Sequence, residues 1–177
     1  MPYSFPIVLG IDPGARQIGV AIFCGEELQF YAVKSFKKRS RQETLRKLRK
    51  VIEKMISAYR VEVVALEKVV YVQQNKSFVK TVYEEIKDFL EKREILFYEY
   101  HPRLIRQVIC QNEKPTKRNT ALLLSQKYNE LVRYFSVPRL WQKRYFALLF
   151  DAIAVGLVCA GDLDDKQRQL KNRTIEE

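Results

Sequence analysis

The chain has 177 residues, 47% of them hydrophobic and 30% charged, as expected for one soluble globular domain over residues 1–177. Its formal net charge of +11 indicates a polyanionic partner, most often nucleic acid, although a merely basic surface would give the same value. Residues 1–6 lack the basic and apolar segments of a signal peptide, and the longest nearly apolar run, residues 145–161, is short for a membrane span. We therefore expect a cytoplasmic protein without a membrane segment.

Three apolar segments with very short connections begin the chain and predict an antiparallel meander of strands: residues 7–11, 18–23 and 28–33. The sequence SRQE at residues 40–43 is a capping box and predicts the start of a helix with one apolar and one basic face. The pattern then predicts a strand, a loop, a helix and a fifth strand, at residues 61–66, 69–74, 75–93 and 95–100.

The chain after His101, which we expect to end the fifth strand, has a helical pattern with breaks near Pro115 and Pro138. A final apolar helix is expected over residues 144–160, followed by a frayed, flexible tail at 161–177. The order of elements predicts an α/β fold. Its mixed five-stranded sheet begins antiparallel and continues parallel, with the fourth strand beside the first and helices flanking the sheet.

The positive charge is clustered. Between residues 34 and 50 nine residues are basic and one is acidic, and further clusters lie at 114–118 and 139–144. We expect the first cluster to contact the nucleic-acid backbone, through residues that include Lys37, Lys38, Arg39 and Arg41. An ordinary solvated surface is the alternative. The aromatic residues Trp141 and Tyr145 are expected to pack against the protein, with stacking on bases as the alternative.

Three acidic residues lie at costly positions. Asp12 ends the first strand and Glu67 ends the fourth, so parallel neighbours would bring them together at the sheet edge where ligands bind in open α/β folds. Asp151 lies in a helix so apolar that its carboxylate must be paired or metal-bound. Taken singly, Asp12 could be a turn residue, Glu67 a solvated acid at a strand end, and Asp151 the partner of a buried arginine. Taken together, they predict one shared site.

Close carboxylates repel each other, and a divalent cation removes that repulsion. Oxygen ligands suit Mg²⁺ or Mn²⁺. Two such ions can activate a water molecule and stabilise the leaving oxygen in phosphodiester hydrolysis. Together with the basic surface, the acids predict a nuclease.

The strings GIDPGARQIG, ALEKV followed by NKS, and DAIAVGL resemble, in this order, the motifs of RuvC-type Holliday junction resolvases. The order of elements is similar to their ribonuclease H-like fold over roughly residues 7–160. The first motif alone also resembles actin-like ATPases and sugar kinases, which need two such domains. The resemblance implies a homodimeric crossover junction endodeoxyribonuclease that cuts four-way junction DNA in recombination and repair. It also implies Mg²⁺ (or Mn²⁺) as cofactor and branch-migration helicases as partners.

The resemblance also implies roles for individual residues. Asp12, Glu67 and Asp151 match acidic metal ligands and catalytic residues, and Lys117 matches a catalytic lysine that faces the scissile phosphate. The remaining expected DNA contacts are polar, basic or aromatic residues near these motifs: Arg106, Arg118, Tyr71, Asn75 and Ser77. A solvated helix face would equally explain Arg106 and Lys117, and a helix cap would explain Asn75 and Ser77.

The chain departs from the family pattern at several positions. Leu148 stands where an Asp or His usually precedes the last acid by one turn, and Val70 stands where a Phe usually stacks at the junction centre. The glycines expected near Thr81 and Glu85 are absent, and CQNEKPT replaces a glycine-rich segment. Two alternatives therefore stay open: a nuclease of the same fold acting on RNA or other branched nucleic acid, as in the YqgF-like group, or a catalytically weakened nucleic-acid-binding paralogue.

Overall fold

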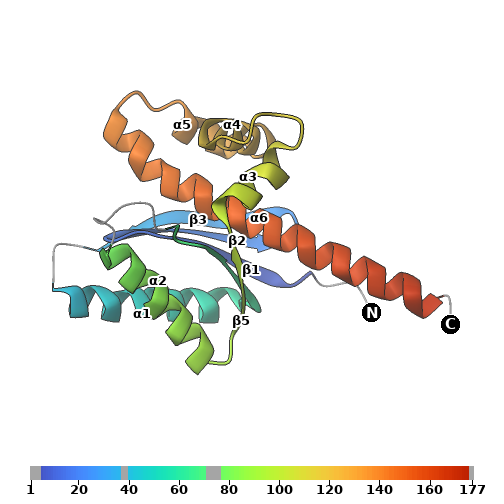
Figure 1. The fold of residues 1–177 in the computed structure, drawn as a ribbon, viewed down its shortest axis with the longest axis horizontal. Coiled ribbons are helices and arrows are strands. Elements are labelled where there is room, and N and C mark those ends of the chain that lie inside the picture. The colour runs from blue at the N-terminus through green and yellow to red at the C-terminus, as the bar shows by residue number, and fades with distance from the viewer. Residues whose placement is uncertain (1–4, 37–39, 71–76, 176–177) are drawn as a thin grey trace.

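A computed structural model describes residues 5–36, 40–70 and 77–175 and shows one mixed sheet with the strand order β3-β2-β1-β4-β5 (Figure 1). The strands are β1 (Ile7–Pro13), β2 (Gln17–Cys24), β3 (Glu27–Ser35), β4 (Val63–Glu67) and β5 (Leu96–Tyr100). The first three pair antiparallel, whereas β4 is parallel to both β1 and β5. The predicted mixed sheet, with the fourth strand beside the first, is confirmed.

Helices cover both faces of the sheet (Figure 1). One face carries α1 (Arg41–Tyr59) and α2 (Ser77–Lys92). The other carries α6 (Leu140–Ile175) together with the shorter helices α3 (Pro102–Cys110), α4 (Lys117–Lys127), η2 (Asn129–Leu131) and α5 (Val132–Phe135). Alternating side chains of the strands therefore enter two separate apolar cores, one on each face.

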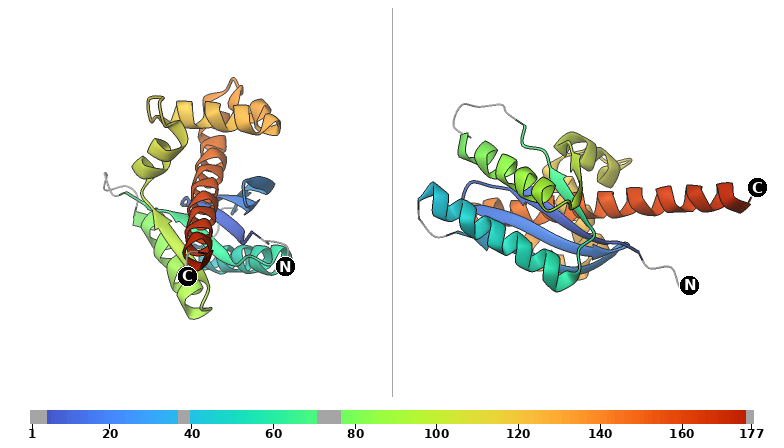
Figure 2. Two further views of the ribbon diagram at one scale, coloured as in Figure 1. Left: turned by 90° about the vertical axis from the view of Figure 1, so that its right-hand side faces the viewer. Right: turned by 90° about the horizontal axis from the view of Figure 1, so that it is seen from below.

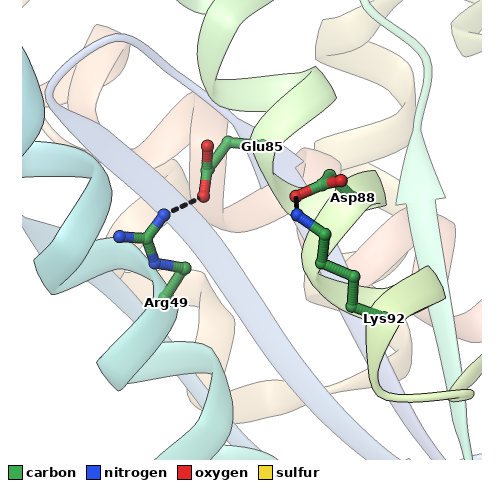
Figure 3. Close-up of polar contacts among 4 residues, drawn as sticks. All are labelled: Arg49, Glu85, Asp88 and Lys92. Atoms are coloured by element: carbon green, nitrogen blue, oxygen red, sulfur yellow. Dashed lines mark hydrogen bonds and ion pairs between the residues drawn. The ribbon is translucent and has the colours of Figure 1, made fainter.

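The predicted cap of α1 is present, because the Ser40 side chain accepts a hydrogen bond from the Glu43 N–H. Ion pairs join α1 to α2 and to the residue directly after it: Arg49 pairs with Glu85, and Glu53 pairs with Arg93. Figure 3 shows the first of these beside the Lys92–Asp88 pair within α2. Part of the basic face of α1 thus holds two helices together.

The helix α6 lies against β1 and β2 at very short distance. A Cβ atom added at Gly19 would stand 1.8 Å from the Leu148 carbonyl oxygen, and one added at Gly10 would stand 2.3 Å from the Ala152 carbonyl oxygen. Only glycine at these two positions allows the helix backbone to come this close to the strands.

The end of α6 differs from the expectation. The prediction that the helix stops near residue 160 is wrong, since α6 continues to Ile175 and extends away from the sheet (Figure 2). Tertiary contacts support the extension as far as residue 166: the Tyr100 hydroxyl donates a hydrogen bond of 3.0 Å to Asp162, and the Lys166 ammonium lies over the Tyr98 ring. Residues 161–166 are exposed or half-buried, so a polar sequence there is compatible with regular helix.

The segment Leu140–Lys166 of α6 is long and apolar enough to cross a membrane by length and composition alone. Its most apolar window is 61% buried inside the fold, as in the core helix of a water-soluble domain. Packing against the sheet therefore accounts for its apolar sequence.

We predict that Gly19→Ala lowers the free energy of unfolding by roughly 2–4 kcal/mol, because its methyl group must displace either α6 or β2. Urea denaturation measures the change. Gly161→Ala is the matched control: Gly161 has open space around its Cβ position in α6, so alanine there should stabilise by about 0.5–1 kcal/mol. Equal stabilities of the two variants would contradict the proposed contact.

Candidate active site

The three predicted acids converge on one face of the sheet. Asp12 lies in β1 and Glu67 ends β4, and the parallel register Ile11↔Leu66 makes these strand ends neighbours. Val63 and Ala65 belong to the core beneath α6, so Glu67, two residues further, faces the same helix. All three acids are buried: Asp12 and Asp151 are 8% exposed and Glu67 is 9% exposed.

Lys117 joins this cluster from α4. The Thr116 side chain caps the helix by accepting a hydrogen bond of 3.1 Å from the Asn119 N–H, so that Lys117 is the first helical residue. Its ammonium forms an ion pair with the Asp151 carboxylate. Burial works against the charge of Lys117, but Asp151, Asp12 and Glu67 together outweigh it and raise the pKa of this lysine.

Glu67 carries the strongest electrostatic signature in the cluster. Burial, and then the nearby Asp151 charge, raise its pKa from 4.5 to about 8, while Lys117 and Arg106 offset part of the shift. Without a further cation, Glu67 therefore holds its proton at neutral pH. A buried carboxyl with a raised pKa beside other acids is typical of functional sites.

The cluster fits a hard divalent cation by the chemistry of its donors: three buried carboxylates from β1, β4 and α6. Within the described ranges, no three acidic, histidine or cysteine side chains are grouped tightly enough to form a ready coordination shell. Lys117 instead supplies a positive charge at Asp151. The predicted donor set is thus assembled on one face of the sheet, and its carboxylates are not gathered around a single point.

Position 148 lies on the side of α6 that meets this site. The Leu148 Cδ2 atom would be 3.6 Å from a Cβ atom at Gly14, in the turn directly after β1. Leu148 is half-buried and offers no ligand atom. The departure from the family pattern therefore lies beside the turn that follows Asp12.

The other predicted DNA-contacting residues are more dispersed. Arg106 in α3 is half-buried and close enough to affect the pKa of Glu67, and Arg118 is exposed on α4. Arg41 is exposed at the start of α1, with its guanidinium over the Phe78 ring of α2. Ser77 begins α2. The remaining predictions fall outside the described residues: Lys37, Lys38, Arg39, Tyr71 and Asn75.

His101 and two aromatic residues can also be placed. His101 caps α3 by accepting a hydrogen bond of 3.2 Å from the Arg103 N–H, directly after β5 as expected. Tyr145 packs against Phe146 as expected, whereas Trp141 is 60% exposed, so most of its surface does not pack as expected. It belongs to the exposed first turn of α6, next to Leu140.

A pocket of about 510 Å³ adjoins the acid cluster and was not predicted from the sequence. It lies between α4, α5 and α6, and Lys117 and Asp151 belong to both the pocket and the cluster. Its aromatic lining includes Tyr134 of α5 together with Phe146 and Phe150 of α6, and the spacing of the last two is that of ordinary core residues in a helix. No sequence pattern distinguishes such residues from the core.

The sheet order and the acid cluster on its α6 face define a ribonuclease H-like protein. The profile of the family "Crossover junction endodeoxyribonuclease RuvC" matches residues 8–132, which is more than half of the chain. The chain therefore belongs to the RuvC family. The match ends before α6, so the place of Asp151 in the site rests on the structure.

Individual relatives agree with this assignment. A crossover junction endodeoxyribonuclease RuvC from Sulfurovum sp. (strain NBC37-1) is 27% identical over 125 residues, which are 67% of this chain and 79% of the relative. RuvC of Thermus thermophilus, solved with a Holliday junction substrate, superposes with a TM-score of 0.65 at 20% identity, covering 85% of this chain and 90% of that one. The yeast mitochondrial Holliday junction resolvase Ydc2 has a TM-score of 0.62 at 11% identity, covering 96% and 85%. At these identities, the solved structures establish the fold alone.

The raised pKa of Glu67 predicts how stability depends on pH in the metal-free protein. The folded state retains the Glu67 proton up to about pH 8, whereas the unfolded chain loses it near 4.5, so this contribution to stability is lost as the pH rises between these values. Glu67→Gln should therefore gain in melting temperature relative to the wild type across this range. Glu91→Gln, at an exposed position on α2, is the control and should show no such trend. A difference between Glu67→Gln and wild type that is independent of pH would disprove the effect.

Proposed function

We propose that the protein is a metal-dependent endonuclease that resolves four-way DNA junctions by phosphodiester hydrolysis. The observation that carries the proposal is the convergence of Asp12, Glu67 and Asp151 on one face of the sheet in a chain of the RuvC family. The positive net charge and the basic residues around the cluster suit a DNA substrate.

The buried carboxylates would hold a divalent cation, which we take to be Mg²⁺, with Mn²⁺ as the alternative. When bound, the cation supplies an activated water and stabilises the charge that develops on the leaving oxygen. RuvC-family nucleases depend on divalent metals, and the oxygen donors of this chain suit these two ions.

The chain's own residues have distinct parts in this proposal. Glu67 gives up its proton to become a ligand, so the site should assemble more readily as the pH approaches about 8. Lys117 releases Asp151 and turns its ammonium, on a side chain that is 57% exposed, toward the scissile phosphate. Arg106 adds a second positive charge beside Glu67.

A four-way junction must be cut on two strands, and the described residues supply one acid cluster, so we propose that two copies act together as a homodimer. Arg41 in α1 and Arg118 in α4, on opposite faces of the sheet, would contact different parts of the DNA arms, together with the predicted contacts outside the described residues. We further propose that the protein acts in the cytoplasm in recombination and repair, where branch-migration helicases would present the junction.

We expect Asp12→Asn to abolish cleavage of a synthetic four-way junction in Mg²⁺ while junction affinity stays equal or rises, because one negative charge near phosphate is removed. Gel assays of nicking and binding measure both quantities. A duplex of the same arms and a branched RNA serve as competing substrates, which tests the alternative of an RNA-directed nuclease. Cleavage at the wild-type rate would remove Asp12 from the active site.

Position 148 offers a gain-of-function test. Leu148→Asp should lower the Mg²⁺ concentration needed for half-maximal cleavage, since a new carboxylate lies near the turn after Asp12. Leu149→Asp is the matched control: Leu149 is 2% exposed in the core, so an unpaired acid there should destabilise by roughly 2–5 kcal/mol without a gain in metal affinity. If Leu148→Asp behaves like its neighbour, position 148 does not reach the metal.

A further inference from the structure

The pocket of about 510 Å³ between α4, α5 and α6 adjoins the acid cluster, and the chemistry proposed above assigns no role to its aromatic walls. Its volume lies within the range of roughly 300–1,000 Å³ typical of small-ligand pockets. Lys117 and Asp151 line it, so any group that occupies the pocket lies next to the acid cluster.

The walls of the pocket are aromatic. Tyr134 and Phe135 of α5 and Phe146 of α6 are half-buried there, and the Tyr134 and Phe146 rings have centroids 4.8 Å apart. Contacts from behind hold these rings in place, since Tyr31 packs edge-on against Tyr134 and Tyr145 edge-on against Phe146. A rigid aromatic wall that remains partly exposed can receive a flat ring by stacking.

The rim of the pocket is cationic. Arg118 of α4 and Lys143 of α6 are both exposed at the pocket, and neither forms an ion pair with another described residue. The one acid in the lining, Asp151, already pairs with Lys117. The rim therefore carries net positive charge, which complements a phosphate group.

An aromatic wall, a cationic rim and an opening onto the acid cluster match the parts of one nucleotide: a base, its phosphate and the adjoining phosphodiester. We propose that the pocket binds an unstacked nucleotide of the DNA strand next to the scissile phosphate, a proposal that rests on the proposed nuclease function. A nucleotide at a junction centre is a suitable guest, because unstacking costs least where pairing and stacking are already disturbed. Holding it would position the scissile phosphate against the acids.

The test couples a change in the protein with a change in the DNA. Ala147 is half-buried in the pocket lining, and Ala147→Phe fills the space, while an abasic site in place of either nucleotide that flanks the cleaved bond removes the guest base. Each change alone should weaken junction binding in EDTA by roughly tenfold, the loss expected for one stacked base. Because both changes remove the same contact, their effects should not add. Replacing the intact junction by the abasic one should therefore weaken binding of Ala147→Phe by less than about twofold.

Matched variants control for bulk and charge. Ala58→Phe, at an exposed position on α1, should bind the intact and abasic junctions as the wild type does. Lys143→Ala should weaken binding of the intact junction severalfold, whereas Lys54→Ala, exposed on α1, removes one charge away from the pocket and should not. If Ala147→Phe lowers the melting temperature severely, Lys143→Ala replaces it in the same comparison of intact and abasic junctions, because Lys143 belongs to the rim of the pocket.

The outcomes separate the two proposals. If the wild type cuts no four-way junction in Mg²⁺, the nuclease function fails and the pocket proposal fails with it. If the wild type cuts junctions but Ala147→Phe remains as sensitive to the abasic site as the wild type, the pocket proposal alone is overturned. The pocket proposal is likewise overturned if Lys143→Ala and Lys54→Ala weaken binding equally.

Discussion

The approach of α6 to the first two strands is the constraint on which the rest of the molecule depends. Gly10 and Gly19 have no side chains, so the carbonyl groups of Leu148 and Ala152 rest almost directly on the strands. Asp151 lies between these two residues in the sequence, so the close approach of the helix brings it to the same face of the sheet as Asp12, where both are buried. A methyl group on either strand would have to displace α6 or the strand itself, and would so disturb the position of Asp151 relative to Asp12.

Burying several carboxylates close together raises the free energy of their charged forms. Nearby cationic side chains, rather than solvent, compensate for part of this cost. Lys117 pairs with Asp151, and Arg106 moderates the field at Glu67. The proton retained by Glu67 removes a further negative charge. The metal-free fold is thus held by charges that a divalent ion would have to replace, which links metal affinity to pH and to the first turn of α4.

Much of this arrangement is encoded locally and can be read from the sequence. Short connections between apolar segments predict the meander, and alternation along β4 predicts that Glu67 faces the same side as Val63 and Ala65. The convergence of Asp12 with Glu67 then follows from the parallel neighbours β1 and β4.

Features that depend on distant partners could not be predicted in this way. The helix α6 runs past residue 160 because Asp162 meets Tyr100 and Lys166 meets Tyr98, contacts invisible in the polar composition of the segment. The pairing of Lys117 with Asp151 joins two helices far apart in sequence. Tyr134 and Phe146 look like core residues until the tertiary structure leaves one side of them open.

The order in which the acids occur along the chain has a consequence for synthesis. Asp12 and Glu67 belong to strands that can pair once the first half has been made, whereas Asp151 arrives with α6, after the rest of the sheet. During translation the growing chain would carry two of the three carboxylates and no long helix to complete them. If all three acids serve the proposed nuclease, a nascent polypeptide, tethered among ribosomal RNA and messenger RNA, would gain activity only when its last helix docks.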